Sequence, residues 1–108
     1  MVQDKTIKEA IKRLSKAAPE AMIILFGSRA RGEAGERSDL DLLVVEPEVK
    51  ARRMEMVRLS DVLRPLKIPV DILVTSRKNF EEWSKIPGTV IYRAATEGKV
   101  LYDPEKAD

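Results

Sequence analysis

The chain has 108 residues, of which 44% are hydrophobic and 35% are charged, and its formal net charge is only +2. This length and composition predict a single globular domain over residues 1–108. The absence of cysteine and histidine excludes disulfides, metal sites built on thiolate or imidazole, and catalysis by either residue type, so any acid–base catalyst is Asp, Glu, Lys or Tyr.

Charged residues of both signs are interspersed along the chain without a basic block, so direct binding of nucleic acid is not indicated. No apolar run approaches the roughly 20 residues that a membrane-spanning helix needs. The polar start, Met1 to Lys5, is unlike a signal peptide. We therefore expect a cytoplasmic protein that does not associate with membranes.

Residues 5–18 place apolar side chains at helical spacing, and Pro19 ends the pattern. We expect a helix that packs through one face; its basic face is either simply solvated or contacts an acidic partner or a nucleic acid. Two apolar runs, over about 21–26 and 39–45, then predict buried strands. The loop between them, 27–38, is expected to open with a short helical turn.

Residues 48–64 predict the longest helix, with Pro47 in its first turn. The pattern includes Val57 in a broad apolar stripe that faces the core. Met54 and Met56 are expected to fill gaps in the core or to face a partner.

Residues 70–74 predict a third strand, and Thr75 or Ser76 is placed to cap the helix that follows. Phe80 and Trp83 lie three residues apart on one face of that helix. Packing in the core or at a hinge is the simpler interpretation, and stacking on a base or contact with a partner is the alternative.

Residues 88–97 combine strand propensity with helical spacing, and we predict a helix because Gly98 stands where a helix C-terminal glycine belongs. A short strand over 100–102 and a frayed tail over 103–108 are expected to follow. The predicted order is therefore helix, two strands, helix, strand, two helices, strand. This order predicts an α/β domain with a sheet flanked by helices.

Two aspartates stand at the start of the second apolar run, in Asp39-Leu40-Asp41. Side chains at positions i and i+2 of a strand point to the same face, with Cα atoms roughly 6.5–7 Å apart. Two carboxylates this close repel each other unless a proton or cation lies between them, and Mg²⁺ prefers such oxygen ligands. The pair indicates a metal site, although a half-exposed strand shows the same alternation.

Gly27 and Ser28 end the first apolar run. Glycine lets the backbone approach a ligand, and a serine hydroxyl with free N–H groups at a strand-to-helix turn can donate to phosphate oxygens. Arg29 and Arg31 add charge-assisted donors nearby, though solubility explains them equally well. A Gly-Ser pair alone marks many turns, so the phosphate interpretation depends on the aspartates that follow.

Asp71 is a single carboxylate among the four apolar residues of the third predicted strand. Burying a carboxylate without a partner is costly. Asp71 is therefore either solvated at the end of its strand or part of a cluster with Asp39 and Asp41. The cluster requires the second and third strands to be neighbours.

Gly27-Ser28, ten intervening residues and Asp39-Leu40-Asp41 together resemble the signature of the DNA polymerase β-type nucleotidyltransferase superfamily. More narrowly, the chain resembles the minimal nucleotidyltransferases, which are often the antitoxin partners of HEPN-domain proteins. The resemblance covers nearly the whole chain and implies the polymerase β-like palm fold, with a small mixed sheet flanked by helices. The superfamily places a third carboxylate on a strand after a helix, and Asp71 matches it.

The resemblance implies transfer of a nucleoside monophosphate, most simply AMP from ATP, with release of pyrophosphate. The nucleotide phosphates are expected over Gly27 and Ser28, with Arg29 or Arg31 against the leaving group. Asp39 and Asp41 are expected to hold one or two Mg²⁺ ions, and Asp71 to bind a second metal or to accept a proton.

The chain holds little beyond a catalytic core, so a partner protein is expected to supply the acceptor in a hetero-oligomer. By resemblance, the partner is a HEPN-domain ribonuclease toxin that is silenced when AMP is transferred to one of its tyrosines. Two alternatives stay open: a non-catalytic antitoxin or binding module that acts by contact, and the catalytic subunit of an RNA or small-molecule nucleotidyltransferase. The sequence does not specify the acceptor, the base preference or the number of metals.

Overall fold

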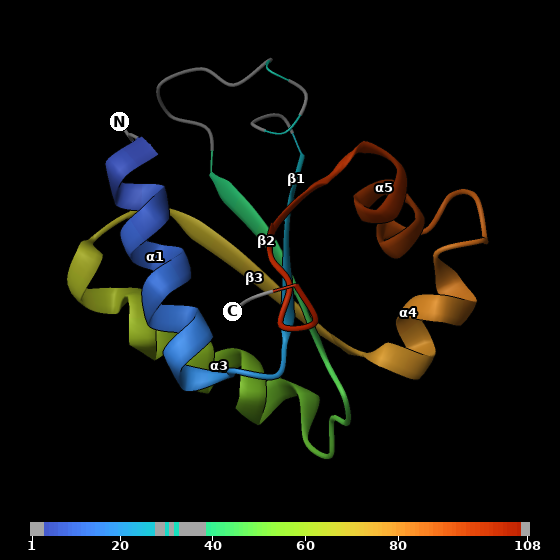
Figure 1. Ribbon diagram of the computed structural model, residues 1–108, viewed down its shortest axis with the longest axis horizontal. Helices are drawn as coiled ribbons and strands as arrows, with labels where there is room; N and C mark the ends of the chain where they lie inside the picture. The colour runs from blue at the N-terminus through green and yellow to red at the C-terminus, as the bar shows by residue number, and fades with distance from the viewer. Residues whose placement is uncertain (1–3, 28–29, 31, 33–38, 107–108) are drawn as a thin grey trace.

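The computed structural model describes residues 4–27, 30, 32 and 39–106 (Figure 1). The order of helices and strands agrees with the sequence-based prediction, and residues 88–97 are largely helical as expected. Among the described helices, none is both long and apolar enough to cross a membrane. In chain order, the elements are α1 (Asp4–Ala17), β1 (Met22–Phe26), β2 (Leu40–Glu46), α3 (Arg52–Leu63), the 3-10 helix η1 (Arg64–Leu66), β3 (Val70–Ser76), α4 (Arg77–Trp83), α5 (Val90–Glu97) and β4 (Lys99–Tyr102).

In the described part of the chain, four strands form one mixed sheet in the order β3-β2-β1-β4. Strand β1 runs antiparallel to β2 and β4, whereas β2 and β3 are parallel. A parallel pair needs a crossover connection, and α3 lies in that connection. The two strands expected to carry the aspartates are therefore neighbours, and the predicted mixed sheet flanked by helices is confirmed.

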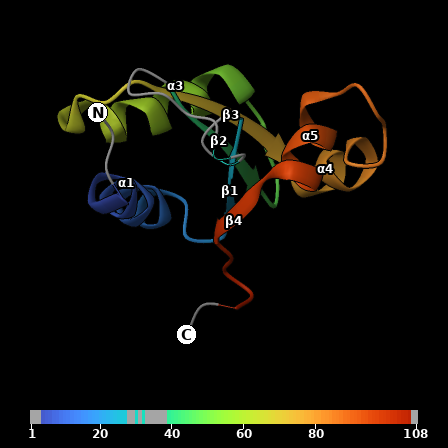
Figure 2. The same ribbon diagram turned by 90° about the horizontal axis from the view of Figure 1, so that it is seen from above.

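Helices α1 and α3 cover one face of the sheet, as the view from above shows (Figure 2). Leu14 of α1 and Leu59 of α3 are fully buried against this face. Because side chains alternate along a strand, Leu40, Leu42 and Val44 of β2 all point into this core, and each is 0% exposed.

Helices α4 and α5 lie over the opposite face, where the buried cluster is smaller (Figure 2). Leu43 and Val45 of β2 meet Ala94 of α5 there, and Phe80 of α4 packs at the margin. Asp41 precedes Leu43 by two residues, so it lies on this second face. The less completely covered face is thus the one that carries the predicted site.

Helix α3 begins later than the prediction of a helix over 48–64. Strand β2 continues through Glu46, Val49 packs against the core from the connecting segment, and the helix starts only at Arg52. Pro47 therefore lies in the connection and not in a first helical turn. The predicted stripe is also wrong at Val57, which is 59% exposed on the outer side of α3.

The two methionines of α3 divide between the expected alternatives. Met56 packs against the core under α1 and α3, whereas Met54 is 74% exposed. Met54 is thus free to contact solvent or a partner, and it fills no gap inside the domain.

Gly98 ends α5 as expected, but in an extended conformation with φ −79° and ψ 167°. A Cβ at this position would lie 2.6 Å from Cγ2 of Ile24 and 3.0 Å from the carbonyl oxygen of Leu25. The Cβ would also collide with the Ala94 carbonyl oxygen of α5. Glycine is therefore needed because the chain passes closely between the end of α5 and β1, and not because of a left-handed turn.

The last residue of β4 and the segment that follows it each contact a distant part of the chain. The Tyr102 hydroxyl donates to the Pro19 carbonyl at 3.2 Å, and Arg77 Nη1 lies 2.8 Å from Glu105 Oε1. Residues 107 and 108 lie outside the described residues, so a frayed tail over 103–108 stays a prediction.

Candidate active site

The register of β2 and β3 brings two of the predicted aspartates together. Asp41 and Asp71 are direct partners in the parallel pairing, where neighbouring strands lie about 4.8 Å apart. Their side chains lie on the same face of the sheet. Leu43 and its partner Leu73, two residues further along the strands, lie on that face too. Asp71 is therefore not an isolated strand-end carboxylate.

Asp39 lies just before β2 and is exposed. The backbone N–H of Leu40 donates to the Pro69 carbonyl at 2.9 Å, which fixes this point against the segment leading into β3. The Leu40 side chain is completely buried on the α1–α3 face. This burial turns Asp39 and Asp41, the residues on either side, toward the opposite face.

Gly27 follows the last residue of β1, and its backbone passes against Asp41. Phe26 and Asp41 are partners in the antiparallel pairing of β1 with β2. A Cβ on Gly27 would collide with Oδ2 of Asp41 and lie 3.1 Å from its Cγ. The φ angle of Gly27, +79°, also lies in the left-handed region that favours glycine. A larger residue here would displace the Asp41 carboxylate.

The remaining predicted phosphate-binding residues, Ser28, Arg29 and Arg31, lie outside the described residues. Their contacts with phosphate therefore stay predictions, as does the short helical turn. Ala30 is described: its N–H donates to the Gly27 carbonyl at 3.1 Å, and its side chain is buried in the core under α1.

The aspartates differ in exposure, since Asp39 and Asp71 are exposed and Asp41 is half-buried. Among the residues that the structure describes, no three acidic side chains converge closely enough to hold a metal ion, so the predicted cluster of Asp39, Asp41 and Asp71 is not assembled as a three-carboxylate site. Mg²⁺ is usually held by one or two carboxylates, with water and substrate phosphates as its other ligands. Asp41 and Asp71 fit a magnesium ion whose coordination a nucleotide completes.

A cavity of about 400 Å³ lies between strands β2 and β3 and helices α4 and α5. Its lining includes Leu43 and Leu73, which follow Asp41 and Asp71 by two positions on the same strands. Trp83, at the end of α4, forms part of the wall and is 46% exposed. Sequence reasoning did not find this cavity, because no sequence pattern shows how far two helices stand from a sheet.

The other end of β2 carries a second group of charges that the sequence did not reveal. Arg58 on α3 donates from Nε and Nη2 to the two carboxylate oxygens of Glu55, each at 2.7 Å. Burial, followed by the hydrogen bond with Glu55 and its charge, raises the pKa of Glu46 to about 7. The hydrogen bond from Arg58 lowers the pKa of Glu55 to about 2. A proton and an arginine thus compensate these two carboxylates.

Comparison with known proteins gives the family. The sequence profile of the nucleotidyltransferase domain matches residues 5–102. The chain belongs to this family. A Methanocaldococcus jannaschii protein, MJ0604, whose name gives protein adenylyltransferase as its inferred activity, is 30% identical over 106 residues, covering 94% of this chain and 100% of that protein. The prediction of a nucleotidyltransferase enzyme is therefore confirmed.

Solved structures share the nucleotidyltransferase fold. A Sulfolobus solfataricus protein, described as an inferred nucleotidyltransferase, gives a TM-score of 0.68 at 23% identity, covering 95% of this chain and 82% of its own. A toxin–antitoxin structure with AMP-PNP gives a TM-score of 0.64 at 22% identity, covering 94% of this chain and 74% of the matched chain. A complex of tri-AMPylated Shewanella oneidensis HEPN toxin with an MNT antitoxin gives a TM-score of 0.61 at 19% identity, covering 96% of this chain and 75% of the matched chain. These similarities confirm the predicted fold.

Proposed function

We propose that this nucleotidyltransferase transfers AMP from ATP to a partner protein, with Mg²⁺ as its metal. The observation that supports this most directly is the pairing of Asp41 with Asp71, with the backbone of Gly27 packed against Asp41. Carboxylates side by side on one face, next to a glycine turn, suit a metal-bound triphosphate. The domain family supplies the reaction class.

In the proposed mechanism, Asp39 and Asp41 would hold Mg²⁺, which would neutralise charge on the phosphates. Asp71 would either help to bind a second metal or accept the proton of the attacking hydroxyl. The hydroxyl oxygen forms a bond to the α-phosphorus, the bond from the α-phosphorus to the bridging oxygen breaks, and pyrophosphate leaves. Gly27 and Ser28 receive the phosphates, and Arg29 and Arg31 donate to them.

The acceptor we propose is a tyrosine of a HEPN-domain toxin, which makes this chain the antitoxin of a cytoplasmic two-protein pair. Two comparisons support the proposal. The S. oneidensis complex joins an AMPylated HEPN toxin to an antitoxin in a structure that shares this fold. The M. jannaschii relative, similar over its full length, carries a name that gives protein adenylylation as its activity.

Transfer of label tests this function. The protein is incubated with Mg²⁺, ATP labelled on the α-phosphate, and lysate from its own source, beside the variant Asp39→Asn/Asp41→Asn. The control variant, Glu81→Gln/Glu82→Gln, removes the same number of carboxylates from exposed positions on α4. We expect one labelled protein band with the wild type and the control, and none with the aspartate variant.

The other outcomes separate the alternatives. Label in RNA or in a small molecule keeps the reaction and contradicts the protein acceptor. If no molecule is labelled although ATP binds, the protein acts by contact, and the catalytic proposal is wrong.

A further inference from the structure

We infer that the cavity between β2, β3, α4 and α5 binds the purine base of the nucleotide, with the indole of Trp83 as one wall. The inference rests on the proposed function and names a further part of the same substrate site. It assigns a role to the single tryptophan of the chain, which the phosphate chemistry does not use.

The first argument is continuity along two strands. Asp41 and Asp71 are paired, and two residues later Leu43 and Leu73 are paired and line the cavity. A strand rises about 3.3 Å per residue, so the leucine pair lies roughly 6.6 Å beyond the aspartate pair on the same face. A ribose joins a phosphate to a base over a separation of this order.

The second argument is direction. The aspartates lie at the start of both strands, since β2 begins at Leu40 and β3 at Val70. In one direction the sheet ends, and in the other it continues into the cavity. Among the residues that the structure describes, the cavity side is therefore where a nucleotide with its phosphates at the aspartates finds an apolar surface for its base.

The third argument is the chemistry of the lining. Ligand cavities of about 300–1,000 Å³ are usually lined mainly by apolar side chains, with polar groups that fix orientation. This cavity of about 400 Å³ combines seven apolar residues, among them Leu43, Leu73 and Trp83, with five polar ones: Arg52, Thr75, Ser76, Asn79 and Thr89. Asn79 is an exposed polar residue of the lining. An asparagine amide can donate and accept together at the edge of adenine.

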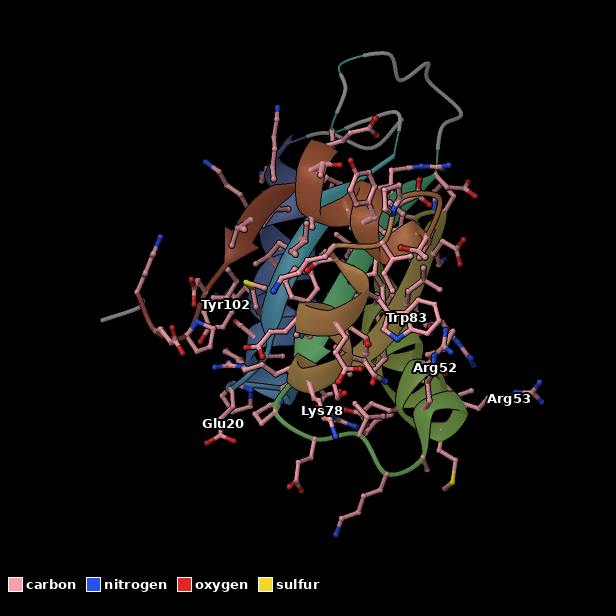
Figure 3. All side chains as sticks on the ribbon, turned by 90° about the vertical axis from the view of Figure 1, so that its right-hand side faces the viewer. Glu20, Arg52, Arg53, Lys78, Trp83 and Tyr102 are labelled. Atoms are coloured by element: carbon pink, nitrogen blue, oxygen red, sulfur yellow. The ribbon has the colours of Figure 1, made fainter. Side chains whose placement is uncertain are left out.

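Trp83 and Phe80 diverge although both lie on α4. Phe80 packs toward the sheet, whereas Trp83 is 46% exposed at the cavity wall, on the same side of the molecule as Arg52 from α3 (Figure 3). Thr89 fixes this wall: its hydroxyl donates to the Trp83 carbonyl at 3.1 Å and accepts from the Tyr92 N–H at 3.0 Å. The backbone at the end of α4, which carries Trp83, is thus tied to the N-terminal cap of α5.

Trp83 itself provides the first test. ATP and tripolyphosphate are titrated separately in the presence of Mg²⁺, and tryptophan emission is recorded. We expect ATP to change the emission saturably and tripolyphosphate, which lacks a base, to leave it unchanged. An equal response to both, or calorimetric binding of ATP without any change in emission, overturns the assignment.

Substitution gives a second test with a matched control. Trp83 and Ile86 are each 46% exposed, but Ile86 does not line the cavity. We expect Trp83→Ala to weaken ATP binding about tenfold, as loss of aromatic stacking on a base does, and Ile86→Ala to leave it unchanged. Calorimetry measures both, and tripolyphosphate should bind all forms equally. Unchanged ATP affinity in Trp83→Ala overturns the assignment.

These tests are independent of group transfer. ATP binding that depends on Trp83, without label transfer to any protein, contradicts the proposed function and supports the base site. Label transfer to a protein, with ATP affinity that does not depend on Trp83, supports the proposed function and contradicts the base site.

Discussion

Strand β2 carries an acidic side chain near each end, and the two carboxylates have opposite surroundings. Glu46 lies beside Glu55 and Arg58, where a proton and a guanidinium balance the charge within the protein. Asp41 lies beside a second carboxylate, Asp71, at a face that solvent reaches. Two carboxylates side by side at an open face favour a bound cation. At the Glu46 end, the positive charge comes from Arg58.

The Glu46 end also joins secondary-structure elements. Besides its two bonds to Glu55, Arg58 donates from Nη1 to the carbonyl of Ala17, the last residue of α1, at 3.0 Å. One oxygen of Glu46, Oε2, is buried without a hydrogen-bond partner among the described residues. This end of β2 therefore holds α1, α3 and the sheet together, and we expect substitutions there to change stability and not chemistry.

The largest effect is expected at the other end. Asp41→Asn removes a proposed metal ligand, and we expect the rate of AMP transfer to fall about a thousandfold or more. We expect the domain to stay folded, because asparagine has nearly the same size and shape as aspartate. Initial rates with labelled ATP and thermal melting measure the two effects. Glu46→Gln makes the same chemical change at the opposite end and should keep the wild-type rate; a tenfold loss there would contradict the comparison.

Gly27→Ala tests whether the residue beside Asp41 must lack a side chain. The new Cβ would collide with the Asp41 carboxylate at a φ of +79°, so we expect about a hundredfold loss of transfer and roughly 1–2 kcal/mol of stability. Gly88 is the control, because its φ is +91° and a Cβ there meets nothing within 4 Å. Gly88→Ala should cost similar stability and leave transfer intact. Equal loss of transfer in both variants would show that backbone strain, and not the contact, is responsible.

The Asp41 end was largely predictable from the sequence, and the Glu46 end was not. Alternation around Leu40 turns Asp39 and Asp41 to one face, and a helix between two strands makes the parallel neighbour that brings Asp71 to them. These are local periodicities and one connection rule. The contact between Glu46 and Glu55 depends on where α3 crosses the sheet, which no local pattern specifies.

The same limit explains the other differences. Val57 has the apolar character of a core residue, but α3 starts at Arg52 and its register leaves Val57 exposed. The cavity beside Trp83 depends on the distance between helices α4 and α5 and the sheet. Tertiary packing decides both the exposure of Val57 and the size of the cavity. The periodicity of a single sequence shows which face of a helix is apolar, but not how helices are placed against a sheet.

Stability should depend on pH through Glu46. Folding raises its pKa from the ordinary value of 4.5 to about 7, so its contribution is present below pH 4.5 and is lost as the pH rises through about 7. Glu55 has the opposite sign: its pKa falls to about 2, so its contribution is present above pH 4.5 and is lost as the pH falls toward 2. The pair therefore stabilises the fold most near pH 4.5.

Glu46→Gln keeps a neutral side chain at every pH. The variant should therefore not show the loss of folding stability that Glu46 causes in the wild type between pH 5 and 8. Allowing for solvent screening, we expect the variant to gain about 1 kcal/mol relative to wild type over that interval. Urea unfolding at pH 5, 6, 7 and 8 measures it. Glu48→Gln, at an exposed neighbouring position, is the control. A constant difference between wild type and Glu46→Gln across the interval would show that Glu46 does not hold the proton.

The smallest effect separates the Glu46 end from ordinary surface charge. Helix α3 has a second arginine–acid pair at the same spacing, Asp61 with Arg64, whose side chains are 51% and 80% exposed. Such pairs contribute little, so Asp61→Asn should change the free energy of unfolding by less than about 0.5 kcal/mol. Glu55→Gln should cost about 1 kcal/mol, because it weakens two charge-assisted bonds beside the buried Glu46 oxygen. Equal costs at pH 7 would mean that helical spacing alone sets both energies, and Arg58 would then be no more than another surface arginine.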